Sequence, residues 1–557
     1  MILTKERSVF RNNGAILFLV AVLLGCLMLF SGGADAATEG DWEYSVDGNE
    51  ATITGYSGSG GAAVIPSTLG GYDVTSINRS AFSGSDKVTS VSIPSSVTDL
   101  DNGVFKDCTK LVTVDFLPGS TITLLPGEAF KGCTSLKNIN IPDSVTHIGR
   151  YYSNYVFEGC TSLVTISIPD SVTHIGKDAF KDCTSLKSIV FTENSLLRTF
   201  EYSEGLSNVV PIVTGCSSLE SFYFPKLVDG AVDSSHFEGC TSLKSFTAHP
   251  DSKRFIAIDG VLYYKSSKVV DEETVYYPSS IYIYPMAKEG DDYVAPETVD
   301  HLSPGCFTQT ELVNIDLSNT KIQSISAGTF KGCSDLVTVD FPSTLTRIYP
   351  GAFEGCSSIS EFVVDENSEY LSVDGGVLFN KDKTEIIRYP IAKVGSTYTL
   401  PPTVRSIAEG AFEGCTSLTK VVIGYNGNFS IGEDAFKGCS NLAIIEITGS
   451  IGKVSIGSSA FDGCPDSLKK YTTNVDMVAY EDDDFTRVCD DLSSGTQYLT
   501  WHYDVYWVTY DGDGDAIVVR HDDRTVTSLI VPDTINGRSV VGLGYALFKD
   551  YDKLVSI

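Results

Sequence analysis

Basic residues are scarce in this chain of 557 residues, where 40 Lys and Arg stand against 71 Asp and Glu. The formal net charge at pH 7 is −31. Phosphate recognition requires clusters of Lys and Arg, and the chain has none, which excludes a nucleic-acid-binding protein. The same shortage argues against docking on anionic lipid headgroups. Because 42% of the residues are hydrophobic, a disordered acidic chain is excluded as well.

Methionine and tryptophan are also rare, with 4 and 3 copies. In contrast, the chain contains 50 Gly, 28 Tyr and 28 Phe. Aromatic residues favour strands and glycine favours turns. This composition is typical of a β-rich protein with many turns and little helix.

Common catalytic motifs are missing: no G-x-S-x-G, H-E-x-x-H or glycine-rich phosphate loop occurs. The seven histidines are scattered, and His147 and His174 share a repeat position that other repeats fill with Arg or Ser, which predicts a solvent-facing position. The acidic run Asp511–Asp515 lacks the Gly and Glu of an EF-hand loop and is interpreted as a turn. We therefore predict that the protein is not an enzyme and has no metal or cofactor site.

The first 36 residues have the three-part pattern of a secretory signal peptide. A basic start precedes the apolar run Ile16–Phe30, and small residues end in an A-x-A site at Ala36. The run is shorter than the ~20 residues that a membrane-spanning helix needs. We predict cleavage between Ala36 and Ala37, export of the chain and no integral membrane span in the mature protein. An uncleaved anchor is the alternative.

A short motif, F-x-[GD]-C, recurs ten times between residues 105 and 464. The copies are Phe105–Cys108, Phe130–Cys133, Phe157–Cys160, Phe180–Cys183, Phe237–Cys240, Phe330–Cys333, Phe353–Cys356, Phe412–Cys415, Phe436–Cys439 and Phe461–Cys464. The shortest spacing between neighbouring copies is 23 residues, and others are 24, 25 or 27. Self-similarity at this period predicts a solenoid.

One repeat begins at Leu163, where Leu163, Ile166 and Ile168 follow the pattern L-x-x-I-x-I. This spacing predicts a short strand with its apolar side chains turned inward, and Phe180 then returns an aromatic ring to the interior. A single repeat cannot bury its apolar face alone. We expect about seventeen rungs, stacked ~4.8 Å apart between residues 82 and 475 in a parallel strand ladder.

The repeat I-P-x-S-V-T-x-I-G-x-x-A-F-x-G-C-x-S-L resembles that of the BspA-type leucine-rich repeat surface proteins. The clearest copies are Ile141–Cys160, Ile168–Leu186 and Phe341–Cys356. The resemblance implies a β-rich leucine-rich-repeat solenoid with rungs of ~23 residues. Two longer units, Asp251–Tyr263 and Asn367–Phe379, match a variant of the family.

The two longer units contain D-G pairs between alternating apolar residues, which predict β-hairpin insertions. In the first unit, we interpret the polar insert Lys265–Thr274 as a loop. The segment between residues 474 and 506 has apolar residues at roughly helical spacing, Val488 among them. The predicted organisation is a signal peptide (1–36), an N-terminal hairpin cap (37–81), a solenoid (82–475) with hairpin insertions near 250–300 and 363–404, a C-terminal cap and linker (476–506) and the start of a second, apparently truncated array (507–557).

Fourteen cysteines would suggest disulfides in an exported chain. Most of them occupy one position of the repeat, and no C-x-x-C pair occurs. Removal of Cys26 with the signal peptide leaves an odd number. We favour inward-facing thiols, and disulfides between adjacent rungs remain the alternative.

Because no catalytic, metal or cofactor site is predicted, we expect the function to depend on the protein surface. The third and fifth positions of L-x-x-I-x-I point away from the core and form an exposed face. The candidate binding residues on this face are Thr113, Asp115, Asn138, Asn140, Thr165, Ser167, Ser221, Tyr223, Asn314, Asp316, Thr338 and Asp340. The tyrosine-rich stretch Tyr263–Tyr293 is a second candidate, although some of its rings must belong to the core.

Together these features predict an exported cell-surface adhesion protein that recognises a protein or matrix ligand on host or neighbouring cells. Two alternatives remain open. The chain could be a structural spacer of the cell envelope, which would have a uniform face. It could also bind or degrade polysaccharides, which would need aromatic rings stacked in a groove.

Overall fold

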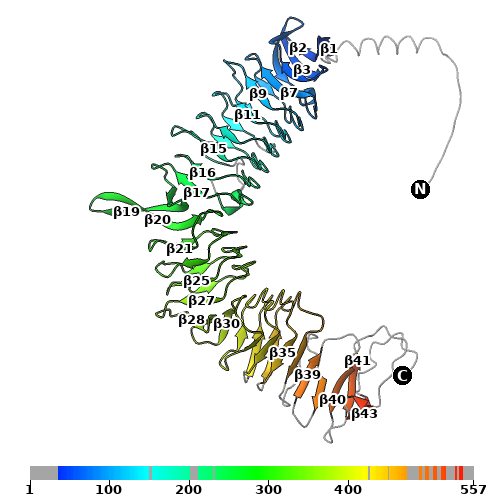
Figure 1. Cartoon of the computed structure of the whole chain (residues 1–557), viewed down its shortest axis with the longest axis vertical. Coiled ribbons are helices and arrows are strands. Elements are labelled where there is room, and N and C mark those ends of the chain that lie inside the picture. Colours follow the sequence, from blue (N-terminus) through cyan, green and yellow to red (C-terminus); the bar gives the residue numbers. More distant parts are fainter. Residues whose placement is uncertain are drawn as a thin grey trace, which may run out of the picture.

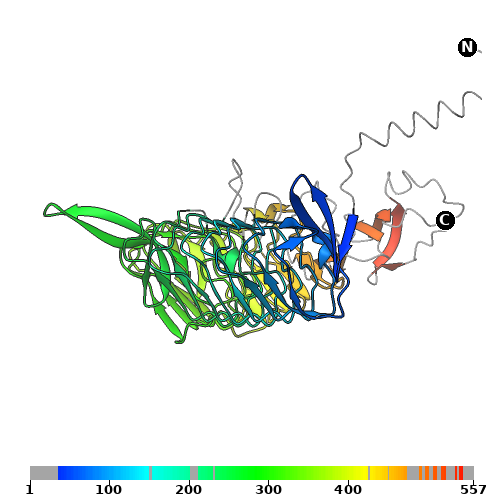
Figure 2. The ribbon, with the colours of Figure 1, turned by 90° about the horizontal axis from the view of Figure 1, so that it is seen from above.

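The structure, a computed structural model, describes residues 36–149, 154–200, 211–229, 232–424, 427–448, 451–472, 488–491, 496–500, 506–510, 516–521, 534–535 and 538–543. The backbone coils rung upon rung into one elongated solenoid, and the stack bends into an arc (Figure 1). Seen from above, the rungs overlie one another as flattened loops (Figure 2). The predicted solenoid is confirmed, and the stack is curved.

Two ladders of short parallel strands run along the solenoid. The first contains the strands of the L-x-x-I-x-I positions: β4 (Gly61–Val64), β7 (Val88–Ile93), β9 (Thr113–Phe116), β11 (Asn138–Asn140), β13 (Thr165–Ser167), β15 (Ser188–Val190), β16 (Ser221–Phe224), β17 (Ser245–Ala248), β21 (Asp292–Val294), β23 (Asn314–Asp316), β25 (Thr338–Phe341), β27 (Glu361–Val364), β31 (Thr397–Thr399), β33 (Lys420–Ile423), β35 (Ile444–Ile447) and β37 (Lys469–Thr472). The second ladder contains β8 (Asp99–Leu100), β10 (Leu124–Leu125), β12 (His147–Ile148), β14 (His174–Ile175), β22 (His301–Leu302), β24 (Ser324–Ile325), β26 (Arg347–Ile348), β32 (Ser406–Ile407), β34 (Gly427–Ile431) and β36 (Ile451–Ile456). In the described residues the helical segments are two 3₁₀ turns, η1 (Arg79–Ala81) and η2 (Ser234–Phe237).

The register of these ladders places equivalent residues of successive rungs directly opposite each other. Ile166 of β13 pairs with Ile189 of β15, and both side chains are buried. The phenylalanines of the F-x-[GD]-C motif also stack: the rings of Phe130 and Phe157 lie 5.3 Å apart, and those of Phe157 and Phe180 lie 5.4 Å apart. Their planes differ by 9° and 3°. The shared apolar column supplies the core that a single rung lacks.

The F-x-[GD]-C motif is a turn whose third residue needs a left-handed backbone. Gly132 has φ +74°, and Asp107 occupies the same position in its own rung with φ +59°. Asp tolerates this region better than most other residues, which explains why the motif accepts either type. The turns also form a ladder, because Phe130 N–H donates to the Val156 carbonyl and Gly132 N–H donates to the Glu158 carbonyl, each at 2.8 Å.

The twelve cysteines between residues 108 and 464 are free thiols, and all except Cys464 are buried. Most of these thiols donate to a carbonyl of the preceding rung, as Cys133 Sγ does to the Phe105 oxygen at 3.0 Å and Cys183 Sγ to the Phe157 oxygen at 3.1 Å. Burial raises the pKa of Cys183 to about 12. Such a buried thiol with a raised pKa is protonated and packs as a small apolar side chain.

Two β-hairpin insertions interrupt the regular rungs, as predicted. The first contains β18 (Phe255–Ile258), β19 (Val261–Val270) and β20 (Glu273–Ile283). The second contains β28 (Leu371–Asp374), β29 (Val377–Asn380) and β30 (Glu385–Arg388). Within each insertion, neighbouring strands are antiparallel.

The loop predicted at Lys265–Thr274 is wrong. Strand β19 continues to Val270, which pairs with Glu273 at the start of β20. The two residues between them, Asp271 and Glu272, have φ +49° and +70°. Positive φ at both central positions is the geometry of a type I′ turn, which allows the flanking strands to keep pairing up to the tip.

At the N-terminal end, β1 (Ala36–Glu39) pairs with β2 (Trp42–Asp47), which forms an antiparallel hairpin with β3 (Glu50–Tyr56). β3 pairs with β6 (Tyr72–Ile77), which also contacts β5 (Thr68–Leu69). Ala36 and Ala37, the predicted cleavage residues, both lie in β1. Residues 1–35 of the predicted signal peptide lie outside the described residues.

At the other end, β38 (Val488–Asp491) and β39 (Thr496–Thr500) extend the first ladder beyond β37 by antiparallel pairing. The helical spacing predicted for this segment is wrong at Val488, which lies in a strand. Farther along are β40 (Tyr506–Tyr510), β41 (Ala516–His521), β42 (Thr534–Ile535) and β43 (Arg538–Leu543). The predicted turn at Asp511–Asp515 lies outside the described residues.

Candidate binding surfaces

All twelve candidate residues of the strand face lie on first-ladder strands, and none of them is buried. The exposed members are Asp115, Asn138, Asn140, Thr165, Ser167 and Ser221. The half-buried members are Thr113, Tyr223, Asn314, Asp316, Thr338 and Asp340. The alternation of apolar and polar residues in each strand therefore places them outside the core, as the two-residue period of a strand requires.

The strand register brings these residues into columns. Asn138 pairs with Thr113 on β9, and Asn314 pairs with Thr338 on β25. In the second pair, Thr338 Oγ1 donates to Asn314 Oδ1 at 2.6 Å, and Asn314 Nδ2 donates to Asp292 Oδ1 at 2.7 Å. Part of the hydrogen-bonding capacity of the face is thus used between neighbouring rungs.

The stretch of this face between the two insertions is acidic. Asp316 pairs directly with Asp340, and Glu361 lies on the following strand. Partial burial raises the pKa of Asp340, and the charges of Asp316 and Glu361 raise it further. Beyond the second insertion, by contrast, Lys420 Nζ neutralises Glu446 at 2.6 Å. The acidic stretch offers a complement to a basic surface.

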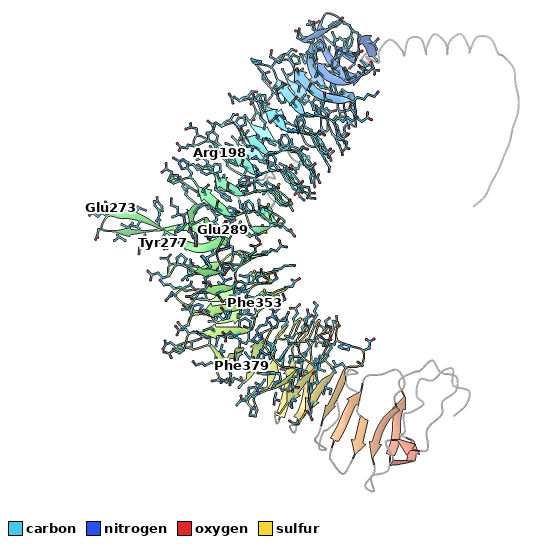
Figure 3. The ribbon with its side chains drawn as sticks, viewed as in Figure 1. Arg198, Glu273, Tyr277, Glu289, Phe353 and Phe379 are labelled. Carbon is cyan, nitrogen blue, oxygen red and sulfur yellow. The ribbon has the colours of Figure 1, made fainter. Side chains whose placement is uncertain are left out.

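The second candidate surface is hairpin β19–β20, which projects from the outer side of the arc (Figures 1 and 2). Glu273 and Tyr277 lie on this projection (Figure 3). The tyrosines of the stretch divide into three groups by burial. Tyr263, Tyr282, Tyr284 and Tyr293 are buried; Tyr264 and Tyr277 are half-buried; and Tyr276 is exposed.

The distal part of this hairpin, residues 266–279, combines exposed apolar side chains with unpaired strand edges. Val269 is 73% exposed and Tyr276 is 55% exposed, and Val270 and Val275 accompany them. β19 pairs with β18 only as far as Tyr264, so beyond that point the described strands β19 and β20 pair with each other alone. Exposed edges and apolar side chains are features that protein partners recognise.

Histidines 147 and 174 stack on each other with ring centroids 4.7 Å apart and planes within 2°. Both are half-buried, so one side of the pair packs on the rung and the other side remains accessible. Partial burial lowers the pKa of His174, and nearby His147 and Arg198 lower it further. The stacked pair is therefore part of the packed rung surface.

Among the described residues, no group of three or more His, Cys, Asp or Glu side chains is arranged to hold a metal ion. The described residues also include no helix of sufficient length and apolarity to cross a membrane.

The family model for the BspA type leucine rich repeat region matches six copies in this chain, at residues 69–154, 151–268, 290–390 and 394–495. The matched residues make up most of the chain and include the second insertion, whereas residues 269–289, which contain β20 of the first insertion, lie between two matches. A comparison with curated proteins found no match.

Several solved structures are similar. A leucine rich cell surface protein from Faecalibacterium prausnitzii has 24% identity and a TM-score of 0.45, covering 75% of this chain and 96% of that protein. A leucine-rich repeat protein from Bacteroides ovatus has 22% identity and a TM-score of 0.44, covering 74% of this chain and 94% of that protein. The T. pallidum leucine rich repeat protein has 31% identity and a TM-score of 0.28, covering 33% of this chain and 80% of that protein.

Proposed function

Since this chain belongs to the BspA-type leucine-rich repeat family, we propose that it is an exported, non-catalytic cell-surface protein that binds proteins of host cells, neighbouring cells or the extracellular matrix. The sequence supports export through its signal-peptide pattern. An elongated repeat array presents a long continuous surface, which suits protein recognition.

Hairpin β19–β20 is the single feature that supports this proposal most directly. A two-stranded ribbon with exposed Val269 and Tyr276 at its distal end is unfavourable in water unless a partner covers it. Lys265 Nζ lies 4.1 Å from the centre of the Tyr276 ring and donates to the Pro250 and Ser252 carbonyls, so it helps to hold this ring against the rung. Tyr is among the residues that contribute most binding energy at protein interfaces.

The acidic stretch of the strand face supports a second contact. Asp316 and Asp340 face outward in neighbouring rungs. A partner with a basic patch would neutralise them, and association would then weaken as the ionic strength rises.

The test is a version of the protein in which the first insertion is shortened to the length of the second. Lys265 and Lys381 occupy equivalent positions, because their backbone N–H groups donate to Arg254 and Tyr370 at 2.8 and 2.7 Å. Residues 266–279 are therefore replaced by Asp-Lys-Thr, the sequence of residues 382–384. The mature protein and this variant are compared for binding to fixed epithelial cells, neighbouring bacteria and immobilised fibronectin, laminin and collagen.

We expect the shortened variant to keep its circular dichroism spectrum and melting temperature but to lose binding. The matched control is Val394→Thr, because Val394 is an exposed apolar residue outside the hairpin, at 96% exposure. Unchanged binding by the shortened variant would contradict the assignment to the hairpin. Absence of binding to every cell and matrix protein would favour the spacer alternative, and binding confined to a glycan array would favour the polysaccharide alternative.

A further inference from the structure

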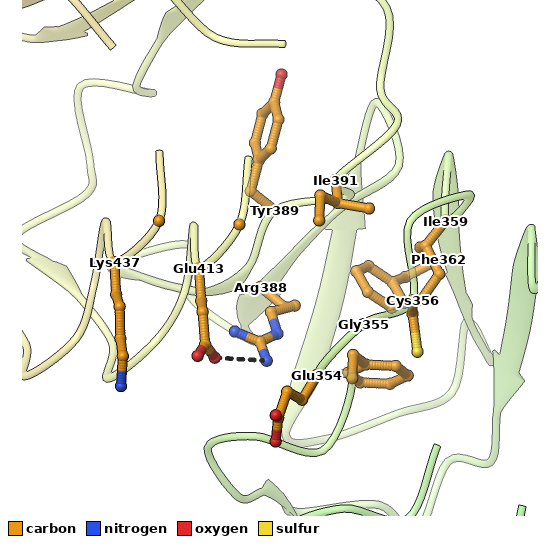
Figure 4. A pocket seen from close by; sticks show the side chains of 13 residues that line it. Glu354, Gly355, Cys356, Ile359, Phe362, Arg388, Tyr389, Ile391, Glu413 and Lys437 are labelled. Atoms are coloured by element: carbon orange, nitrogen blue, oxygen red, sulfur yellow. Dashed lines mark ion pairs between the residues drawn. The ribbon is translucent and has the colours of Figure 1, made fainter. Parts of the chain in front are cut away.

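A cavity of about 290 Å³ opens where the second insertion joins the next regular rung (Figure 4). Its walls come from four places: the turn Phe353–Cys356, Ile359 and Phe362 at β27, the end of β30 with the residues that follow it, and the turns at Glu413 and Lys437. The cavity lies within the rung stack, away from the distal end of hairpin β19–β20.

Arg388 is the central polar residue of this cavity. It is the last residue of β30 and points inward like Ile386 two residues earlier, so only 6% of it is exposed. Glu413 Oε2 lies 3.9 Å from Arg388 Nη2, which is beyond hydrogen-bond distance. The guanidinium carbon lies 5.9 Å from the centre of the Phe353 ring. A guanidinium has five N–H donors, and in this structure none of them donates to a described residue.

Backbone donors converge on the same cavity. In the preceding rung, Phe330 N–H donates to the Ala352 carbonyl at 2.9 Å and Gly332 N–H donates to the Glu354 carbonyl at 2.7 Å. The equivalent amides one rung later belong to Phe353 and Gly355. The insertion displaces the turn that would accept from them, so these two N–H groups make no hydrogen bond to a described residue.

The charged side chains at the rim are already paired. Lys437 Nζ contacts Asp434 at 2.9 Å, and Glu354 contacts Lys331 at 3.3 Å. Arg388 faces the carboxylate of Glu413 without a hydrogen bond to it, so its N–H donors remain for a ligand. Phe362, Ile359 and Ile391 form an apolar wall beside it.

We propose that this cavity binds a carboxylate that is attached to a small apolar group. The guanidinium of Arg388 and the N–H groups of Phe353 and Gly355 supply donors for the two carboxylate oxygens, and the apolar wall accommodates the attached group. Glu413 disfavours a dianion such as phosphate, because a second negative charge would face its carboxylate. The C-terminal residue of a peptide and a free aliphatic acid both have this chemistry.

The proposal is tested by isothermal titration of the mature protein with three probes. They are a short peptide ending in a free Leu carboxylate, the same peptide ending in a carboxamide, and hexanoate. We expect the peptide acid to bind and the amide to bind about 10- to 100-fold more weakly, because charge-assisted hydrogen bonds are lost. Binding of hexanoate as well would identify a general acid site, whereas binding of the peptide acid alone would identify a reader of peptide C-termini.

Arg388→Ile tests the role of the guanidinium, since Ile283 occupies the same position in the first insertion. This variant should lose the preference for acid over amide. Arg347→Ile, which removes an exposed arginine on β26, is the matched control and should bind as the unmodified protein does. Equal affinity for acid and amide in the unmodified protein, or no binding of either acid, would overturn the proposal, and this comparison does not depend on how a variant folds.

Discussion

The two hairpin insertions share one backbone plan. In each, a residue after the hairpin returns to the preceding rung: Ala287 N–H donates to the Leu243 carbonyl, and Ala392 N–H donates to the Ile359 carbonyl, both at 2.8 Å. They differ in two places. The first difference is the length of the hairpin strands: β19 and β20 have 10 and 11 residues, whereas β29 and β30 have 4 each.

The second difference is the chemistry of the side chains that point into the interior. Ile283 and Thr308 in the first insertion correspond to Arg388 and Glu413 in the second, because Leu262 pairs with Ile283 as Leu378 pairs with Arg388. Ile283 is 4% exposed and Arg388 is 6% exposed, so an apolar and a charged residue occupy the same buried position. One scaffold thus presents a projecting ribbon in one copy and a polar cavity in the other.

Ile283→Arg should produce the largest effect. It would place a charge in the apolar position of the first insertion, where Thr308 supplies no carboxylate. We expect a loss of stability of about 3–5 kcal/mol, typical of an uncompensated buried charge. Thermal and urea unfolding measure it, and the second change Thr308→Glu should recover part of the loss. An unchanged melting temperature would mean that the two insertions have different interiors.

The converse exchange should act in the opposite direction. Replacing Arg388 by Ile together with Glu413 by Thr removes a buried ion pair and restores the apolar chemistry of the first insertion. We expect an increase in stability of about 2 kcal/mol, because a well-packed apolar side chain avoids the desolvation of the charges. Urea unfolding checks this expectation, and a clear decrease would show that the pair stabilises the second insertion.

The two insertions also differ by one buried hydrogen bond between tyrosine hydroxyls. Tyr263 and Tyr293 share a buried hydrogen bond at 2.8 Å in the first copy. In the second copy, Phe379 and Tyr398 occupy these positions. Tyr263→Phe should reduce stability by about 1–2 kcal/mol, because the Tyr293 hydroxyl loses its partner. Tyr276→Phe, on the exposed distal hairpin, is the control and should leave the melting temperature unchanged.

The smallest effect is expected on the strand face between the insertions. Asp340→Asn removes the repulsion from Asp316 and should raise stability at pH 7 by about 0.5 kcal/mol. The pKa of Asp340 is raised in the folded state, so acidification protonates Asp340 in the folded protein before it does so in the unfolded protein. Acidification therefore stabilises the unmodified protein relative to the Asp340→Asn variant. The advantage of the variant should therefore shrink as the pH falls through the raised pKa of Asp340.

The matched control for this change is Asp115→Asn. Asp115 occupies the same position on β9, where its cross-strand partners are the uncharged Ser92 and Asn140. Melting temperatures of both variants, measured between pH 7 and pH 3, should differ from the unmodified protein only for Asp340→Asn. An equal gain from Asp115→Asn would show that the effect is not cross-strand repulsion.

Particular residues show which features of the structure could be predicted from the sequence. The period of the F-x-[GD]-C motif predicted that Phe130, Phe157 and Phe180 would stack, because a fixed repeat length returns each ring to the same place on successive rungs. The strands at Lys265–Thr274 were missed and a loop was predicted instead, since Asp271 and Glu272 lack the glycine that usually marks a type I′ turn. The polar cavity was missed as well. Arg388 looks like any other charged residue until the strand register shows that it points inward.

The amino-acid sequence by itself determined the repeat, the core positions and the presence of two hairpins, because these depend on local periodicity and turn chemistry. Only the tertiary structure decided what the hairpins do to the stack. The second one displaces a turn, so that beside Arg388 the N–H groups of Phe353 and Gly355 find no acceptor in the part of the chain that the structure describes. Those three groups come from segments about thirty residues apart, and their meeting depends on how successive rungs fit together in space.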